Sequence, residues 1–299
     1  MLLWAREPEV IEGINRAREN IVFLPAVPLS PAIRATGALA DLADCAMLLV
    51  VPPAQHLRAV LSELPQTRSP LILCSKGLEA GSRKLMSEVA AEAQPHAPIA
   101  VLSGPTFAHE VAARLPAAVT LACGDEAVGR SLAESIAQPF FRPYLSTDVI
   151  GAEIGGAVKN VLAIACGIVE GRGLGQNARA ALISRGFAEM TRFGLAKGAR
   201  LETLAGLSGL GDLVLTCSST SSRNFSLGKG IGEGRAAAEL LADRKSVAEG
   251  AFTAPVLQQA AAEIGVDMPV VDAVCALLGG EAAVDEVIGG LLARPIRAE

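Results

Sequence analysis

The sequence predicts a doubly wound α/β domain followed by an all-helical domain, and three observations support this. Short, continuous apolar runs alternate with longer amphipathic segments up to about Thr147. After Asp148 the strand-like runs stop, and a period of 3.6 residues continues almost to the end. Of the 299 residues, 51% are hydrophobic, which is enough for two separate cores. We therefore expect one domain at residues 1–148 and a second at residues 149–299.

Continuous apolar runs in the first domain are typical of buried strands. Amphipathic segments with helical spacing follow most of them. Buried strands separated by helices favour a mostly parallel sheet that helices cover on both faces. We expect the strands at residues 2–5, 46–51, 71–74, 99–102 and 118–121.

The second domain contains long stretches in which apolar residues recur every three or four positions. This spacing predicts amphipathic helices and leaves no room for strands. No linker rich in Pro, Gly or Ser separates the two halves, so the change of period alone places the boundary. We expect the main helices at residues 153–170, 178–197, 251–264 and 270–278.

Composition excludes several classes of function. A net charge of −5, without any block rich in Lys or Arg, argues against a nucleic-acid partner. Six scattered cysteines, with no CxxC pair, predict no metal site and suit a reducing cytoplasm. The longest apolar run, residues 161–169, is under half of the ~20 residues that cross a bilayer. With no signal peptide at Met1, the sequence predicts a cytoplasmic protein that has no membrane span and acts on small molecules.

Two lysines are candidate functional residues. Lys159 follows Gly155-Gly156 in an apolar helix, and the small glycines predict open space beside its stem. Either its amine reaches water at a domain edge, or it is desolvated, which lowers its pKa and suits acid–base chemistry. Lys76 follows a predicted strand, and ligands of open α/β sheets bind beyond the carboxyl ends of strands. An ordinary solvated lysine is the alternative at that position.

Three loops carry further candidates, each with an ordinary structural alternative. A Gly-Pro turn at residues 103–106 would offer N–H groups to an anion or serve only as a turn. Residues 206–212 contain three glycines and Asp212, but they follow no βαβ strand and therefore fail as a dinucleotide fingerprint. Arg223 follows many hydroxyl residues, and it is either a phosphate ligand or a solvated residue in a polar loop.

Taken in order along the chain, these motifs resemble those of the NAD(P)-dependent glycerol-3-phosphate dehydrogenase family. The resemblance runs from Leu3 to about Glu299, and several of the motifs are long. They are Trp4-Ala5-Arg6, Lys76-Gly77-Leu78-Glu79, the stretch 103–108 that begins Ser-Gly-Pro-Thr, the stretch 153–160 that ends Lys159-Asn160, the Gly-rich stretches 171–175 and 206–212, Ser222-Arg223-Asn224, and Val247-Ala248-Glu249-Gly250.

This resemblance implies a Rossmann-like fold and a reaction. The reaction is the reversible reduction of dihydroxyacetone phosphate to sn-glycerol 3-phosphate with hydride from NAD(P)H, which supplies glycerophospholipid synthesis. By resemblance, Lys159 transfers the proton, and Lys76 and Asp212 complete the catalytic set, with no metal. The substrate would contact these three residues and Gly104, Thr106, Asn160, Thr216, Ser222, Arg223 and Asn224. The cofactor would contact Arg6, Phe23, Lys76, Ala108, Arg223, Val247 and Glu249.

Arg6 bears on the choice of cofactor. At the end of the second strand of such a fold, a carboxylate binds the ribose 2′-OH of NAD, whereas an arginine accommodates the 2′-phosphate of NADP. Trp4-Ala5-Arg6 therefore favours NADP, with NAD as the alternative.

The large departure from the family lies at the start of the sequence. The family opens with a strand, a Gly-x-Gly-x-x-Gly loop and a helix, and this unit of roughly 25–30 residues is missing here. Two alternatives therefore stay open: a related dehydrogenase with another small substrate, and a catalytically inactive truncated relic that acts as a binding protein. The sequence also leaves the oligomeric state open, with a homodimer among the assemblies that it allows.

Overall fold

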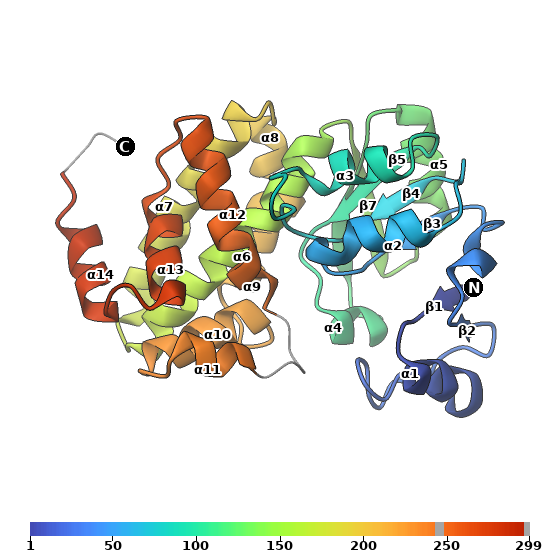
Figure 1. Cartoon of the computed structure of the whole chain (residues 1–299), viewed down its shortest axis with the longest axis horizontal. Helices are drawn as coiled ribbons and strands as arrows, with labels where there is room; N and C mark the ends of the chain where they lie inside the picture. Colours follow the sequence, from blue (N-terminus) through green and yellow to red (C-terminus); the bar gives the residue numbers. More distant parts are fainter. Residues whose placement is uncertain (243–247, 296–299) are drawn as a thin grey trace.

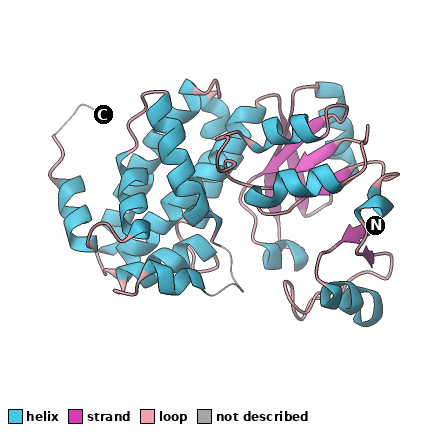
Figure 2. Cartoon of the chain, in the orientation of Figure 1, coloured by secondary structure: helices cyan, strands magenta, loops and turns pink. Residues whose placement is uncertain are grey.

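A computed structural model describes residues 1–242 and 248–295 of the chain. Figure 2 shows the strands gathered in one half of the molecule and helices alone in the other. The long helix α6, Val149–Gly171, begins the helical half directly after the last strand of the α/β half. The predicted order, a doubly wound α/β part followed by a helical part, is therefore confirmed.

The main sheet has five strands in the order β3-β4-β5-β6-β7. All neighbours are parallel except β5 and β6. The sequence did not indicate β7, which contains Pro143; this strand lies at the sheet edge, where proline is tolerated because no neighbour needs its missing N–H. The strands are β3 Leu48–Val50, β4 Leu71–Leu73, β5 Ile99–Ser103, β6 Ala117–Cys123 and β7 Phe141–Ser146.

A separate two-stranded parallel sheet precedes the main one. Strand β1, Leu2–Trp4, pairs with β2, Arg34–Thr36, and the pair has a small core of its own with α1, Pro8–Glu12. Among the described strands, β1 and β3 each pair on one side only. Figure 1 shows this small sheet and α1 set apart at the end of the molecule where the N-terminus lies. The sheet expected from sequence is thus interrupted between β1 and β3.

Helices cover both faces of the main sheet. Leu57, Leu61 and Val89 from α2 and α3 pack on one face, and Leu132 from α5 packs on the other. This explains why the predicted strands read as continuous apolar runs. The helices of this half are α2 Leu57–Glu63, α3 Met86–Ala93, α4 Ala108–Ala112 and α5 Glu126–Ile136, with short turns η1 Gly13–Ala17, η2 Leu39–Leu42 and η3 Ala54–His56.

The helical half is built around α6. Asp148 caps its N-terminus, where Oδ1 accepts a hydrogen bond from the Gly151 N–H at 2.8 Å. The surrounding elements are α7 Gly175–Ala196, α8 Leu201–Leu204, η4 Leu207–Gly211, α9 Asp212–Thr216, α10 Arg223–Gly232, α11 Ala237–Ala242, α12 Glu249–Glu263, α13 Pro269–Gly279 and α14 Val284–Leu292.

Among the described residues, α6 is the one helix long and apolar enough to cross a membrane by length and composition. Yet 89% of its most apolar window is buried inside the protein. Figure 1 shows α6 running through the middle of the helical half. A central core helix is apolar all round because neighbouring helices cover every face.

Glycines let α10 lie directly on the backbone of α6. A Cβ atom on Gly228 would stand 1.9 Å from the Ile164 carbonyl oxygen, and one on Gly167 would stand 2.0 Å from that of Phe225. Both distances are far below van der Waals contact, so only glycine fits at either position. Because of this close approach, the first turn of α10 lies beside the middle of α6.

Candidate active site

Three of the predicted residues meet between the two halves of the molecule. Lys76 follows β4, Lys159 lies in the middle of α6, and Asp212 is the first residue of α9. The Asp212 carboxylate joins both lysines, with Oδ1 at 2.5 Å from Lys159 Nζ and Oδ2 at 2.9 Å from Lys76 Nζ. The side chains of Lys159 and Asp212 are only 8% and 1% exposed. A single buried carboxylate is therefore shared by two ammonium groups.

Thr216 completes the surroundings of Lys159. Lys159 Nζ donates to the Thr216 hydroxyl oxygen at 3.0 Å, and this hydroxyl donates to Asp212 Oδ1 at 3.3 Å. An ammonium group has three N–H donors. With Asp212 and Thr216 using two of them, the third has no acceptor among the described residues and is able to bond a ligand oxygen.

The balance between burial and the attraction of Asp212 separates the pKa values of the two lysines. It lowers the pKa of Lys159 to about 7, with help from the like charge of Lys76 and against the attraction of Asp212. Burial also acts to lower the pKa of Lys76, but the charge and hydrogen bond of Asp212 outweigh it, and the pKa is raised. Near neutral pH Lys159 is therefore able to give or take a proton, while Lys76 stays cationic.

Gly155 and Gly156 make room for this cluster. A Cβ atom on Gly156 would stand 3.2 Å from Lys76 Cγ, and one on Gly155 would stand 2.3 Å from the Ser208 carbonyl oxygen. The prediction of open space beside the Lys159 stem was thus wrong. The space is filled by the stem of Lys76 and by η4, the segment that leads into Asp212.

A second cluster joins α6, α10 and α12. Asn224 donates through Nδ2 to Asn160 Oδ1 at 3.0 Å, and its Oδ1 accepts from the Gly250 N–H at 2.8 Å. Ser222 Oγ caps α10 by accepting from the Phe225 N–H at 3.2 Å. The hydroxyl-rich stretch before Asn224 therefore ends in a helix N-terminus, where Arg223 is exposed in the first turn.

Glu249 connects the second cluster to the α/β half. Its Oε1 accepts a hydrogen bond from the Ala54 N–H at 3.2 Å. Burial raises the pKa of Glu249, while the Ala54 hydrogen bond and the charges of Lys76, Lys159 and Arg223 oppose the rise. Glu249 therefore lies within the field of these cations.

The other predicted residues lie at varying distances from these clusters. Thr106 Oγ1 bonds the Gly104 carbonyl at 3.3 Å, in the loop that leads to Ala108 at the start of α4. Arg6 and Phe23 belong to the small N-terminal unit, and neither bonds the lysine cluster in the part of the chain that the structure describes. Val247 lies outside the described residues.

Two groups at the site were given no role from the sequence, although both belong to the quoted motifs. One is the Gly250 N–H. The other is Ser103 Oγ, which is buried, has no partner among the described residues, and lies 3.0 Å from where a Cβ on Gly156 would stand. The motifs assigned roles to the neighbouring Glu249 and Gly104, but only the fold shows these contacts.

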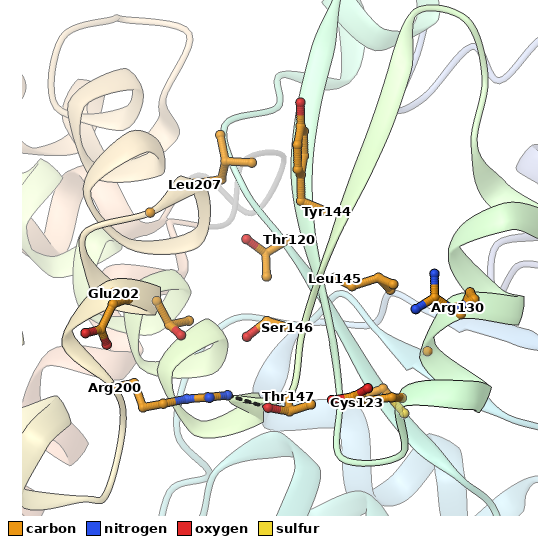
Figure 3. A pocket seen from close by; sticks show the side chains of 14 residues that line it. Thr120, Cys123, Arg130, Tyr144, Leu145, Ser146, Thr147, Arg200, Glu202 and Leu207 are labelled. Atoms are coloured by element: carbon orange, nitrogen blue, oxygen red, sulfur yellow. Dashed lines mark hydrogen bonds between the residues drawn. The ribbon is translucent and has the colours of Figure 1, made fainter.

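A pocket of about 840 Å³ lies elsewhere, between β6, β7 and α8. Figure 3 shows Arg200 at its edge, where it donates to Thr147 Oγ1 at 2.5 Å. None of the predicted site residues lines it, and the positive charges of its two arginines are balanced by the negative charges of Glu126 and Glu202.

Among the described residues no group of three His, Cys, Asp or Glu side chains could hold a metal ion. The buried lysine cluster is therefore the candidate active site.

Comparison with known proteins assigns the family. The family models for the N-terminus and the C-terminus of NAD-dependent glycerol-3-phosphate dehydrogenase match residues 1–129 and 148–289. The glycerol-3-phosphate dehydrogenase [NAD(P)+] 1 of Sphingopyxis alaskensis is 62% identical over 99% of this chain and 90% of its own length. The chain belongs to the NAD-dependent glycerol-3-phosphate dehydrogenase family.

Two further glycerol-3-phosphate dehydrogenases support the family assignment. The glycerol-3-phosphate dehydrogenase [NAD(P)+] of Novosphingobium aromaticivorans is 64% identical, over the whole chain and 91% of its own length. The crystal structure of the Coxiella burnetii glycerol-3-phosphate dehydrogenase superposes with a TM-score of 0.93 at 37% identity, covering 98% of this chain and 91% of that one. The resemblance read from the sequence motifs is therefore confirmed.

The shared carboxylate predicts a large loss of stability in Asp212→Asn. The buried Lys159 and the partly buried Lys76 would lose their counter-charge, so the free energy of unfolding should fall by about 3–5 kcal/mol. Urea denaturation would measure it on the chain joined to the family's first strand and glycine loop. The matched control is Asp267→Asn, because Asp267 is 53% exposed in its pair with Arg294 and should contribute at most about 1 kcal/mol. Equal losses in the two variants would contradict the buried pairing.

Proposed function

We propose that this chain, when joined to the first strand and glycine loop with which its family begins, catalyses the reversible reduction of dihydroxyacetone phosphate to sn-glycerol 3-phosphate, with NADPH preferred and NADH as the alternative hydride donor. The observation that carries the proposal is the buried Lys159, which is held between Asp212 and Thr216 in a member of this family. The product supplies glycerophospholipid synthesis. We place the enzyme in the cytoplasm, without a membrane span or a nucleic-acid partner, and sedimentation would test whether it is a homodimer.

Lys159 is the proton donor in this proposal. As hydride reaches the ketone carbon, negative charge develops on the carbonyl oxygen, and the free N–H of Lys159 protonates that oxygen. Asp212 orients the ammonium group and stabilises its charged form. Lys76 remains cationic beside it and attracts the anionic substrate. A pKa of about 7 lets Lys159 work in both directions.

Residues at the start of α10 hold the substrate phosphate. Arg223 offers an exposed guanidinium in the first turn, where the helix N-terminus also favours an anion. Its two neighbours in the chain support this turn, Ser222 by capping the helix and Asn224 by its hydrogen bond to Asn160. Thr216 and the loop with Gly104 and Thr106 complete the substrate site.

The two proposed domains divide the work. Residues 1–148 carry most of the cofactor site, including Arg6, Phe23 and Ala108, and residues 149–299 carry the proton donor and the phosphate ligands. Lys76, Arg223 and Glu249 also face the cofactor; Val247, which lies outside the described residues, is assigned to it by the family resemblance alone. The described contact between Glu249 and the Ala54 N–H, which bridges the two parts, supports a cofactor site at their junction.

The kinetic tests use an extended chain, because the family's glycine loop is not among the 299 residues. In the extended chain, the first strand, glycine loop and helix of the Sphingopyxis alaskensis relative are joined to Met1 of the 299-residue chain. The extended chain should oxidise NADPH with dihydroxyacetone phosphate at least about tenfold more efficiently than with dihydroxyacetone, which lacks the anion that Arg223 would bind. Equal efficiency with both ketones would contradict the substrate assignment.

Arg6 should set the cofactor preference. In the extended chain, Arg6→Asp replaces a cation that faces the 2′-phosphate with an anion, so the NADPH/NADH ratio of kcat/KM should fall at least about tenfold. Arg16→Asp is the matched control, because Arg16 lies in the same N-terminal unit, 81% exposed and paired with Glu12. If the ratio is unchanged in Arg6→Asp, this residue does not face the phosphate.

A further inference from the structure

The side-chain amides of Asn224 and Asn160 lie in series behind the phosphate-binding turn of α10. The Gly250 N–H donates to Asn224 Oδ1 at 2.8 Å, and Asn224 Nδ2 donates to Asn160 Oδ1 at 3.0 Å. Both asparagines are buried, at 8% and 6% exposure. One end of this series is a main-chain group, and that group fixes the direction of the whole series.

The direction follows from donor and acceptor chemistry. A main-chain N–H only donates, so Asn224 must turn its oxygen toward Gly250. Its NH₂ group then faces Asn160, which must accept through its own oxygen. If the Asn224 amide were turned over, its NH₂ group would face the Gly250 N–H, which is also a donor, and this buried N–H would have no acceptor. Asn160 is left with its NH₂ group, and no described residue accepts a hydrogen bond from it.

We infer that the Gly250 N–H is a positioning group that makes Asn160 an obligate hydrogen-bond donor to an oxygen of the phosphorylated substrate. The identity of that substrate rests on the proposed function. Asn160 directly follows Lys159 on α6, and its partner Asn224 directly follows Arg223 on α10. This relay of hydrogen bonds, from the Gly250 N–H through Asn224 to Asn160, therefore joins the turn of α6 that carries the proton donor to the turn of α10 that carries the proposed phosphate ligand. Every oxygen of the substrate can accept a hydrogen bond from the Asn160 NH₂ group.

Glycine is required at the start of the relay. A Cβ atom at position 250 would stand 2.5 Å from the Asn160 carbonyl oxygen and 2.8 Å from Asn224 Oδ1. Any side chain there would push α12 away and break the first hydrogen bond. Substitution of Gly250 itself would therefore disturb the packing, and the test must change the two amides instead.

The first test measures hydrogen exchange of side-chain and main-chain amides by NMR on the extended chain without ligand. An Asn224 Nδ2 proton should exchange at least about tenfold more slowly than either Asn160 Nδ2 proton, because only the former is bonded in the protein. The Gly250 N–H should be protected, and Asn224→Leu should remove that protection. Slower exchange at Asn160 than at Asn224, or equal rates, would overturn the relay.

The second test is a double-mutant cycle on binding of sn-glycerol 3-phosphate to the NADPH-bound extended chain, by calorimetry. Asn160→Leu and Asn224→Leu should each weaken binding about ten- to hundredfold. Because Asn224 acts through Asn160, adding Asn224→Leu to Asn160→Leu should cost less than about twofold more. Multiplicative losses would show an independent contact by Asn224 and overturn the relay. If the unsubstituted chain binds no glycerol 3-phosphate, the proposed function fails, and the exchange rates still decide the relay.

Discussion

Lys159→Ala is expected to lower kcat for dihydroxyacetone phosphate reduction by about 10²–10⁴-fold, which is the usual contribution of a positioned acid. The lysine is buried, bonded to Thr216 and paired with Asp212, so the substitution removes a proton donor that these two contacts hold in place. Affinity for NADPH should change little. Steady-state kinetics on the extended chain would measure both quantities.

Lys229→Ala provides the control for this experiment, since Lys229 lies on α10 with its side chain 42% exposed. It should retain parental kcat. If Lys159→Ala keeps more than about half of the parental kcat, the residue is not the proton donor.

The 299-residue chain itself is expected to show no NADPH oxidation with dihydroxyacetone phosphate and to be poorly soluble or marginally stable. Strands β1 and β3 each pair on one side only among the described strands, and Leu49 and Val51 at β3 are 49% and 66% exposed. In a fold of this kind the first strand lies centrally, and its glycine loop binds the pyrophosphate. Unpaired strand edges promote aggregation.

The extended chain should gain both solubility and activity when the two proteins are compared at equal concentration. An extended chain in which every glycine of the added loop is replaced by valine is the matched control, and it should regain solubility without activity. Soluble, active enzyme from the 299-residue chain would contradict this account, because it would show that the sheet and the cofactor site form without the added strand.

Much of the fold was predictable because buried strands and amphipathic helices leave a strong periodic signal. The apolar runs at residues 71–74 and 99–102 became β4 and β5, and the helical period after Asp148 became α6 and its neighbours. Strand β7 was missed because Pro143 and polar residues interrupt its apolar pattern. Helix α10 was missed because its glycines and serines have low helix propensity, and contact with the α6 backbone stabilises it instead.

The candidate site was predictable as a set of residues but not as an arrangement. Motifs singled out Lys76, Lys159 and Asp212, yet nothing in their spacing says that one carboxylate joins both lysines. That contact depends on long-range packing through Gly155 and Gly156, which the sequence analysis interpreted as open space. The direction of the Asn224–Asn160 amides likewise depends on α12, which lies far away along the chain.

The central claim is that Lys159 carries the reacting proton with a pKa of about 7. Ketone reduction needs protonated Lys159 and should slow as pH rises through about 7, whereas glycerol 3-phosphate oxidation needs the neutral amine and should accelerate over the same interval. The decisive measurement is the pH profile of kcat/KM in both directions on the extended chain, between about pH 5 and 9, because kcat/KM reports the pKa of the free enzyme. We predict opposite slopes with one common midpoint, absent in Lys159→Ala. Parallel slopes, or a midpoint that persists in Lys159→Ala, would contradict the account.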